Sequence, residues 1–183
     1  IISIENARLL EELQYQIATL TSLRELSLTL SSAVNTDAVA NAVLRTALSI
    51  SHGQYAALFD YDPITEQLIP LIGTERNHSS TSIAESNVMT KVAHMAATNG
   101  EIQPFDHIRH AFPDLPENIE FMSLIAVPII RGNIVNEVLC IAYAEQQAFE
   151  SRDMNTLSLL AIQAAGHLEN SMLHERIRDN NNR

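Results

Sequence analysis

The sequence has one cysteine, no tryptophan and few basic residues. Its 183 residues include 11 Lys and Arg against 22 Asp and Glu, so the formal net charge is −11. A single cysteine cannot form an internal disulfide or a cysteine-rich zinc site, and it fits a reducing compartment such as the cytoplasm. The acidic balance argues against binding to nucleic acid or to an anionic membrane surface, because both need clustered basic residues.

Long apolar runs and enzyme motifs are also missing. No apolar stretch approaches the roughly 18 residues of a membrane-spanning helix. The sequence has no Gly-x-Ser-x-Gly elbow, no phosphate-binding loop and no His-Glu-x-x-His motif. His107 and His110 have a spacing that could hold a metal, but no further ligand cluster accompanies them and surface histidines are the alternative. We therefore expect a cytoplasmic, non-catalytic chain without a metal site.

Hydrophobic periodicity divides the chain into helices and strands. Helical patterns cover residues 3–33, 35–51, 86–100 and 151–179. Strand patterns cover residues 54–62, 67–74, 121–132 and 136–145. Residues 101–120 hold three prolines and should be mainly loop. Strand pairs mixed with helices predict an α+β fold: a central antiparallel sheet of about six strands with helices on its faces, and long N- and C-terminal helices.

Several residues predict local features of these elements. Thr36, Ser86 and Ser151 stand where helices begin and should cap them. Pro70 should lie at a sheet edge or a bulge, and Pro128 at a bulge or a strand end. Residues 121–131 are almost continuously apolar, so this strand should be central and covered on both faces.

The first helix carries a spacing that is typical of a coiled coil. Its alternating steps of four and three residues place these leucines on one seam: Leu9, Leu13, Leu20, Leu23 and Leu30. Gln16 and Ser27 interrupt the seam and would help to set register. Two interpretations remain open: a helix that pairs with a second copy, giving a parallel homodimer through the terminal helices, or an amphipathic helix that packs on its own domain.

The chain begins and ends with similar phrases. "IENARLLEEL" stands at residues 4–13 and "LENSMLHERI" at residues 168–177, and the offset from Glu5 to Glu169 is 169 − 5 = 164 residues. The match spans only about ten positions, so chance similarity between two helices is the alternative to a repeated unit.

Four stretches together resemble a GAF domain. They are "LSSAVNTDAVANAVLRTALSI", "MTKVAHMAATNGEIQPFDH", "FPDLPENIEFMSLIAVPIIRGN" and "AYAEQQAFESRDMNTLSLLAIQAAGHLENSMLHE", and they occur in the family's order over about residues 20–179. The resemblance implies a GAF/PAS-like fold. It also explains the repeated phrase, since GAF modules often run in series and such phrases close a module.

The resemblance implies three parts and a role in bacterial signalling. Residues 1–33 would be a signalling helix whose residues 1–13 close an upstream module, residues 34–150 the sensory core, and residues 151–183 the output helix. The implied function is a sensory or regulatory module that binds a small ligand and relays to an output domain, such as a histidine kinase or a cyclic-dinucleotide enzyme. The alternative is a ligand-free dimerisation scaffold.

Strand alternation and the resemblance together give candidate ligand-pocket residues on the sheet and the helix at 86–99. They are Phe59, Tyr61, Met89, Val92, Phe121, Ser123, Ile125 and Cys140, with Arg109 as an anion contact and His107 beside it. The resemblance argues against haem, since Ile119 stands where haem-binding relatives have His, and against bilin, since Cys140 lies inside a strand. We expect no haem, flavin or bilin. Phe149 and Asp153 match half of the pattern of cyclic-nucleotide GAF domains, although a core anchor and a helix-terminal acid are the simpler interpretation.

Overall fold

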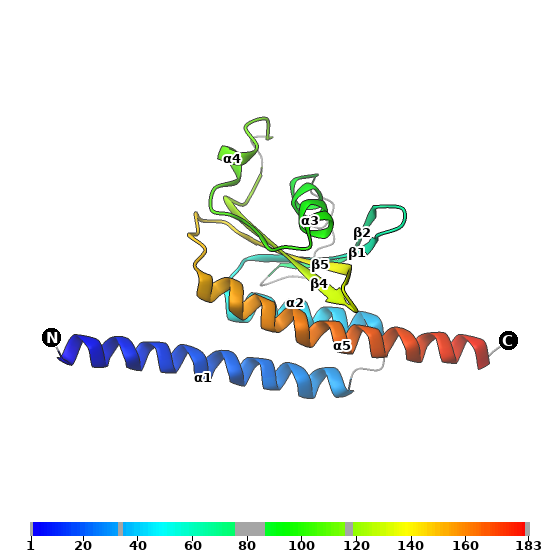
Figure 1. Cartoon of the computed structure of the whole chain (residues 1–183), viewed down its shortest axis with the longest axis horizontal. Helices are drawn as coiled ribbons and strands as arrows, with labels where there is room; N and C mark the ends of the chain where they lie inside the picture. The colour runs from blue at the N-terminus through cyan, green and yellow to red at the C-terminus, as the bar shows by residue number, and fades with distance from the viewer. Residues whose placement is uncertain (1, 33–34, 76–86, 116–118, 182–183) are drawn as a thin grey trace.

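The computed structural model describes residues 2–32, 35–75, 87–115 and 119–181. A single antiparallel sheet has the strand order β2-β1-β5-β4-β3, and helices cover both of its faces (Figure 1). The strands are β1 (Tyr55–Asp62), β2 (Gln67–Glu75), β3 (Gln103–Phe105), β4 (Ser123–Arg131) and β5 (Ile134–Tyr143). The helices are α1 (Ile2–Ser32), α2 (Thr36–Ser51), α3 (Asn87–Asn99), α4 (Ile108–Ala111) and α5 (Ser151–Asn181).

The core has two apolar layers, one on each face of the sheet. In β1, Ala57 and Phe59 point towards α3, whereas Ala56 and Leu58 point towards α2 and α5. This alternation follows from the two-residue period of a strand. In Figure 1, α3 lies on one side of the sheet, α2 and α5 lie on the other, and α1 lies outside them. The sheet is therefore covered on both faces.

The α+β fold predicted from the sequence is confirmed, with two differences in the sheet. The described residues form five strands rather than about six, because residues 101–115 contain only the short β3 and α4. The apolar strand β4 pairs with β5 on one side and with β3 on the other, so β5 is the middle strand. Cover on both faces of β4 is confirmed, since its residues alternate between the two core layers.

Two predicted helix caps are wrong by one residue. Asn35, not Thr36, caps α2, and its side chain accepts a hydrogen bond from the Ala38 N–H at 2.9 Å. At α5 the Met154 N–H donates to the Glu150 carbonyl, so Glu150 rather than Ser151 holds the cap position. The predicted cap at residue 86 lies outside the described residues.

Both strand prolines lie near irregularities of the sheet. Pro70 is on the edge strand β2, next to a register shift opposite Leu58 and Phe59, as predicted. The prediction for Pro128 is wrong, because it lies within the regular pairing of β4 with β5 and the register shift comes one residue later, between Ile129 and Ile130. The neighbouring strand β3 pairs only with residues 124–126, so it ends before Pro128. The missing N–H of each proline therefore costs little sheet pairing.

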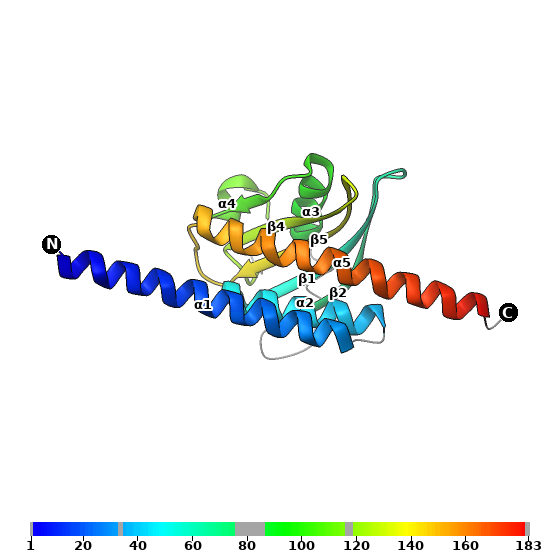
Figure 2. The same cartoon turned by 60° about the horizontal axis from the view of Figure 1, so that its bottom comes forward.

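Helices α1 and α5 run side by side in the same direction. Glu12 contacts Arg152 at one end of the pair, and the Ser27 hydroxyl contacts Gln163 further along. The N-terminal turns of α1 and the C-terminal turns of α5 extend from the domain at opposite ends of its long axis (Figures 1 and 2). Within the described residues, no helix combines the length and the apolar character needed to span a membrane.

Candidate functional site

Most of the predicted pocket residues meet in the layer between α3 and the sheet. This layer contains Phe59, Tyr61, Met89, Val92, Phe121 and Cys140, all of them buried. Phe59, Met89, Val92 and Cys140 have no exposed surface. The layer is apolar, so any ligand held there would be oriented by few polar groups.

Ile125 faces the opposite layer, which makes its assignment to this pocket wrong. Leu124 and Ala126 point towards α3, whereas Ile125 packs with the residues beneath α2 and α5. Both faces of β4 are apolar, so its sequence carries no alternation that fixes which residue faces which layer.

The Ser123 side chain forms hydrogen bonds with neighbouring chain segments at the start of β4. Its hydroxyl lies 2.6 Å from the Asp106 carbonyl oxygen and 3.2 Å from that of Glu145, and the Gln147 N–H donates to it at 2.7 Å. The side chain is completely buried. Its hydrogen-bonding capacity is therefore used within the chain, and its role is structural.

Helix α4 places the two histidines and Arg109 at the margin of the α3 layer. The rings of His107 and His110 stack with their centroids 4.1 Å apart, and Ile108 between them is fully buried. Arg109 donates to the Leu115 carbonyl at 3.5 Å. The described residues contain no group of three or more His, Cys, Asp or Glu side chains arranged to hold a metal ion. The histidine pair thus has no further ligands in the part of the chain that the structure describes.

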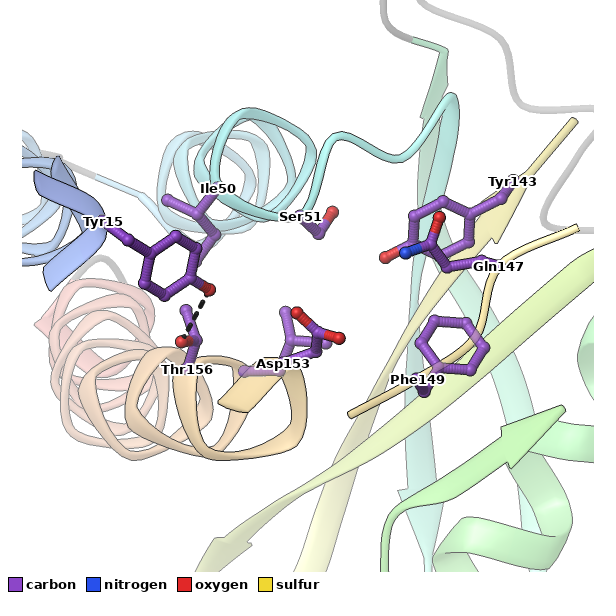
Figure 3. A pocket seen from close by; sticks show the side chains of 9 residues that line it. Tyr15, Ile50, Ser51, Tyr143, Gln147, Phe149, Asp153 and Thr156 are labelled. Carbon is purple, nitrogen blue, oxygen red and sulfur yellow. Dashed lines mark hydrogen bonds between the residues drawn. The ribbon is translucent and has the colours of Figure 1, made fainter. Parts of the chain in front are cut away.

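A second, polar site lies where α1, α2 and α5 meet the end of β5 (Figure 3). It is a cavity of about 20 Å³. That volume holds about one water molecule and no larger ligand. Its lining consists of Tyr15, Ile50, Ser51, Tyr143, Gln147, Phe149, Asp153, Thr156 and Leu157.

Hydrogen bonds and ring contacts join the helices at this cavity. The hydroxyls of Tyr15 and Thr156 lie 3.1 Å apart, and the guanidinium of Arg152 lies 4.2 Å from the centre of the Tyr15 ring (Figure 3 shows the hydroxyl pair). Burial raises the pKa of Tyr143 to about 12, although its hydrogen bond with Ser51 acts in the opposite direction. The contacts of Tyr15 with Thr156 and Arg152 therefore join helix α1 to the first turns of α5.

Phe149 and Asp153 belong to this helix junction and not to the α3 layer. The Phe149 ring packs against Tyr143 with the centroids 5.4 Å apart. The Asp153 carboxylate accepts a hydrogen bond from the Glu150 N–H at 2.9 Å, at the start of α5. These contacts fit the simpler of the two interpretations: Phe149 is a core anchor and Asp153 is an acid at the start of a helix. Sequence reasoning missed Tyr15 and Thr156, because their contact joins residues that are 141 positions apart.

The third candidate surface is the outer face of α1 and α5 (Figure 2). Leu9, Leu13 and Leu20 are more than half exposed, at 56%, 55% and 63%. Leu23 and Leu30 are buried in the protein's own core, at 8% and 3%, so their assignment to a dimer seam is wrong. A groove between α1 and α5, with a volume of about 440 Å³, has Leu20 and Leu159 in its lining.

The polar seam residues also make contacts within the chain. The Gln16 amide donates to Glu12 at 3.3 Å, and the Ser27 hydroxyl donates to the Gln163 side chain at 3.2 Å. Ser27 therefore faces α5 of its own chain, which contradicts its expected position opposite a symmetry mate.

Comparison with known families decides the identity of this fold. The family model of the GAF domain matches residues 35–168, which is most of the chain. The chain belongs to the GAF domain family. The matched range covers the whole sheet and ends within α5, beside the last residues that α5 buries. No curated protein sequence matches the chain.

Solved structures with the same fold come from proteins of different function. The GAF domain of an Acinetobacter phosphoenolpyruvate-protein phosphotransferase is 16% identical, with a TM-score of 0.66, and the alignment covers 84% of this chain and 94% of that chain. The GAF domain of a putative sensor histidine kinase from Pseudomonas syringae pv. tomato is 16% identical, with a TM-score of 0.63 and coverage of 91% and 97%. Free methionine-R-sulfoxide reductase from Neisseria meningitidis is 15% identical, with a TM-score of 0.67 and coverage of 85% and 90%. At these identities the similarity establishes the GAF fold alone.

Cys140 bears on the comparison with the reductase. Its side chain has no exposed surface, and its thiol donates weakly to the Met89 carbonyl at 3.9 Å. Burial raises the pKa of the Cys140 thiol. Both effects oppose formation of the reactive thiolate. The single cysteine of this GAF domain is therefore placed as a core residue.

Proposed function

We propose that this GAF domain is a sensory or regulatory module of a bacterial signal-transduction protein, with a histidine kinase as its first candidate output and a cyclic-dinucleotide enzyme as the second. The observation that carries the proposal is the course of α1 and α5. They lie side by side in the same direction and leave the domain at opposite ends (Figure 1). A change in sheet packing would reach the next domain as a shift or rotation of α5.

In this proposal the module works as a parallel homodimer. Helix α1 exposes Leu9, Leu13, Ile17 and Leu20, and α5 exposes Leu159 and Ile162. In an α-helix, steps of three and four residues bring side chains onto a common stripe, and an exposed apolar stripe marks an interaction surface. A second copy would cover both stripes in a bundle of four helices. Parallel pairing would place both upstream domains at one end and both output domains at the other.

The first turns of α1 support an arrangement in which an upstream module precedes this one. The repeated phrase pairs Ile4 with Leu168, since 168 − 4 = 164. Leu168 is fully buried against its own domain, whereas Ile4 is 75% exposed. A preceding module that packs on α1 as this one packs on α5 would cover Ile4. We therefore assign residues 1–13 to the end of such a module.

If the domain is a sensor, as we propose, its ligand would bind in the layer between α3 and the sheet. Its chemical class is a small, mainly apolar molecule, with Arg109 and His107 as polar contacts at the margin. The second candidate function is a ligand-free scaffold, and the observation that favours it is the complete burial of Phe59, Met89 and Val92 among their own neighbours. In both cases the buried thiol of Cys140 supports a non-catalytic role.

Sedimentation equilibrium tests the dimer. We expect the wild type to be dimeric at tens of micromolar and the Leu13→Glu/Leu20→Glu variant to be monomeric. Covering the exposed half of a leucine contributes about 1 kcal/mol, so two residues in each of two copies contribute about 4 kcal/mol, or roughly a thousandfold in Kd. Ile64→Glu/Ile69→Glu is the matched control, because both residues are exposed on the β1–β2 hairpin. A monomeric wild type, or a control that dissociates equally, contradicts the proposal.

Thermal shift separates the sensor from the scaffold. The purified domain is screened against metabolites and nucleotides, and a ligand at 100 times its Kd stabilises by about 2.7 kcal/mol. The sensory proposal expects a shift that a larger side chain in the α3 layer, Val92→Phe, abolishes in protein that still melts cooperatively. A screen without any shift supports the scaffold. Visible absorbance that remains with the protein through gel filtration would contradict the expected absence of haem, flavin and bilin.

A further inference from the structure

A buried ion pair lies beneath the outer half of α5. Glu137 on β5 is completely buried, and its Oε1 accepts a hydrogen bond from Nη2 of Arg131 on β4 at 2.5 Å. Glu137 shares the α5 face of the sheet with Leu139 and Ile141, which lie two and four residues further along the strand. A carboxylate therefore lies in the layer between the sheet and helices α2 and α5, which is otherwise packed with apolar side chains.

This ion pair is only half satisfied. Glu137 Oε2 and Arg131 Nε are both buried, and neither has a hydrogen-bond partner in the described part of the chain. The other terminal guanidinium nitrogen of Arg131, Nη1, donates to the Met172 sulfur of α5 at 3.9 Å. A buried charge with incomplete hydrogen bonding is costly, and protonation of the carboxylate is the simplest way to remove it.

The charged surroundings of Glu137 are mainly acidic. Asp60 lies directly opposite it in the pairing of β1 with β5, the exposed Asp62 lies beyond Asp60, and the exposed Glu169 of α5 adds a weaker repulsion. Arg131 is the cation of this group. Full ionisation of the carboxylates therefore leaves a net negative charge around the buried Glu137, and addition of one proton lowers it.

The last turns that α5 buries are next to this cluster. Leu168 and Ser171 are buried, and the Ser171 hydroxyl contacts Thr36 of α2 at 3.3 Å. Beyond them α5 leaves the domain (Figure 1). Glu169 and Met172 stand in the same two turns, so the charge of Glu169 and the contact of Met172 with Arg131 both lie where α5 separates from its own domain.

We propose that Glu137 is a proton-binding site that couples pH to the packing of α5 at its exit from the domain. With Glu137 ionised, its buried and incompletely hydrogen-bonded charge, together with the weaker repulsion of Glu169, loosens residues 168–172 of α5. With Glu137 protonated, the buried negative charge is removed, the repulsion falls and residues 168–172 of α5 pack more firmly. The consequence for signalling rests on the proposed role of α5 as the output helix, whereas proton binding and helix packing do not depend on that role.

The direction of the pH dependence follows from the shifted pKa. Burial raises the pKa of Glu137 to about 7, Arg131 opposes this shift, and Asp60 and Glu169 add to it. Burial also raises the pKa of Asp60, against the effect of Arg131. Because the folded pKa of Glu137 exceeds the ordinary glutamate pKa of about 4.5, the stabilisation is complete below about pH 4.5 and is lost as pH rises through about 7.

Two measurements on the whole chain test the proposal. The first is the urea midpoint of the wild type, Glu137→Gln and the exposed control Glu101→Gln between pH 5 and 8. The histidines contribute equally to all three, so the informative quantity is the difference from wild type. We expect Glu137→Gln to be more stable than wild type at pH 8 and equal to it at pH 5, with no such trend for Glu101→Gln. Equal pH dependence in all three proteins overturns the proposal.

The second measurement is amide hydrogen exchange along α5, combined with a ¹³C titration of the labelled wild-type glutamate carboxyls. We expect exchange in residues 168–176 to slow at least threefold from pH 8 to pH 6, after correction for the intrinsic rate, and this change to disappear in Glu137→Gln. The coupling is contradicted if the Glu137 carboxyl titrates below about pH 5. It is also contradicted if Glu137 titrates near neutral pH but the exchange rate in α5 does not change with pH. Neither measurement requires a dimer or a ligand, so failure here leaves the proposed function standing.

Discussion

Helix α1 should be an integral part of the fold, and two leucines on it test this directly. Leu26 is 2% exposed and packs in the core layer with α2, whereas Leu28, two residues further, is 65% exposed. Burying a leucine side chain contributes about 1.5–3 kcal/mol, and truncating one to alanine also leaves a cavity. We expect Leu26→Ala to lower the free energy of unfolding by about 2–3 kcal/mol, near the lower end for such changes, because a surface helix can partly collapse onto the gap.

The control is Leu28→Ala, which removes the same atoms from the same helix. Its cost should be within about 0.5 kcal/mol, as for other exposed positions. In urea, with a slope of about 2 kcal/mol per M, Leu26→Ala should lower the midpoint by about 1–1.5 M and Leu28→Ala should leave it almost unchanged. The measurement is fluorescence or circular dichroism at one fixed protein concentration, so that dimerisation affects both variants equally. Equal midpoints for Leu26→Ala and wild type would show that α1 opens separately from the core.

Three further outcomes follow from the same structure. Ile125→Asp should prevent folding, because it buries an unpaired charge, whereas Ile130→Asp on the same strand, where the side chain is 45% exposed, should give soluble protein with a cooperative melt. Cys140 should react with a thiol reagent only in denaturant, since it is fully buried and burial raises its pKa; rapid reaction of the folded protein would refute its core placement. Asn35→Ala should cost about 1 kcal/mol in thermal or urea unfolding through loss of the cap on α2, and an unchanged stability would contradict the assignment.

The sequence predicts strand faces well where one strand alternates in residue size, and poorly where it does not. In β1 the larger side chains at Phe59 and Tyr61 alternate with Leu58 and Asp60, and the predicted face was confirmed. In β4 every position from 123 to 129 is buried, so the period of two leaves no trace in the sequence. Only contacts with α3 and α5 decide that Ile125 faces the helix pair.

Some features of the candidate sites had a signal in the sequence and others had none. Glu137 begins the apolar run of β5, which is a signal for a strand, but every position from 137 to 143 is buried, so alternation reveals neither its face nor its burial. The contact between Tyr15 and Thr156 joins α1 to α5 across 141 positions and has no local signal. Helix caps fall between these cases, because Asn35 and Thr36 are both good cap residues and only the backbone conformation decides between them.

The leucine seam of α1 fails as one continuous surface for a geometric reason. A straight α-helix drifts by about 20° per heptad relative to a strict seven-residue repeat, so three heptads between Leu9 and Leu30 turn the seam by about 60°. Leu9, Leu13 and Leu20 therefore stay exposed, while Leu23 and Leu30 turn into the core. The last part of the helix thus packs on its own domain, while pairing with a second copy stays a proposal for the exposed first part. We expect the first five turns of α1 to contact a partner and the last three turns to pack on the domain itself. A movement of α2 against the sheet would then shift the partner-binding surface through a single rigid helix.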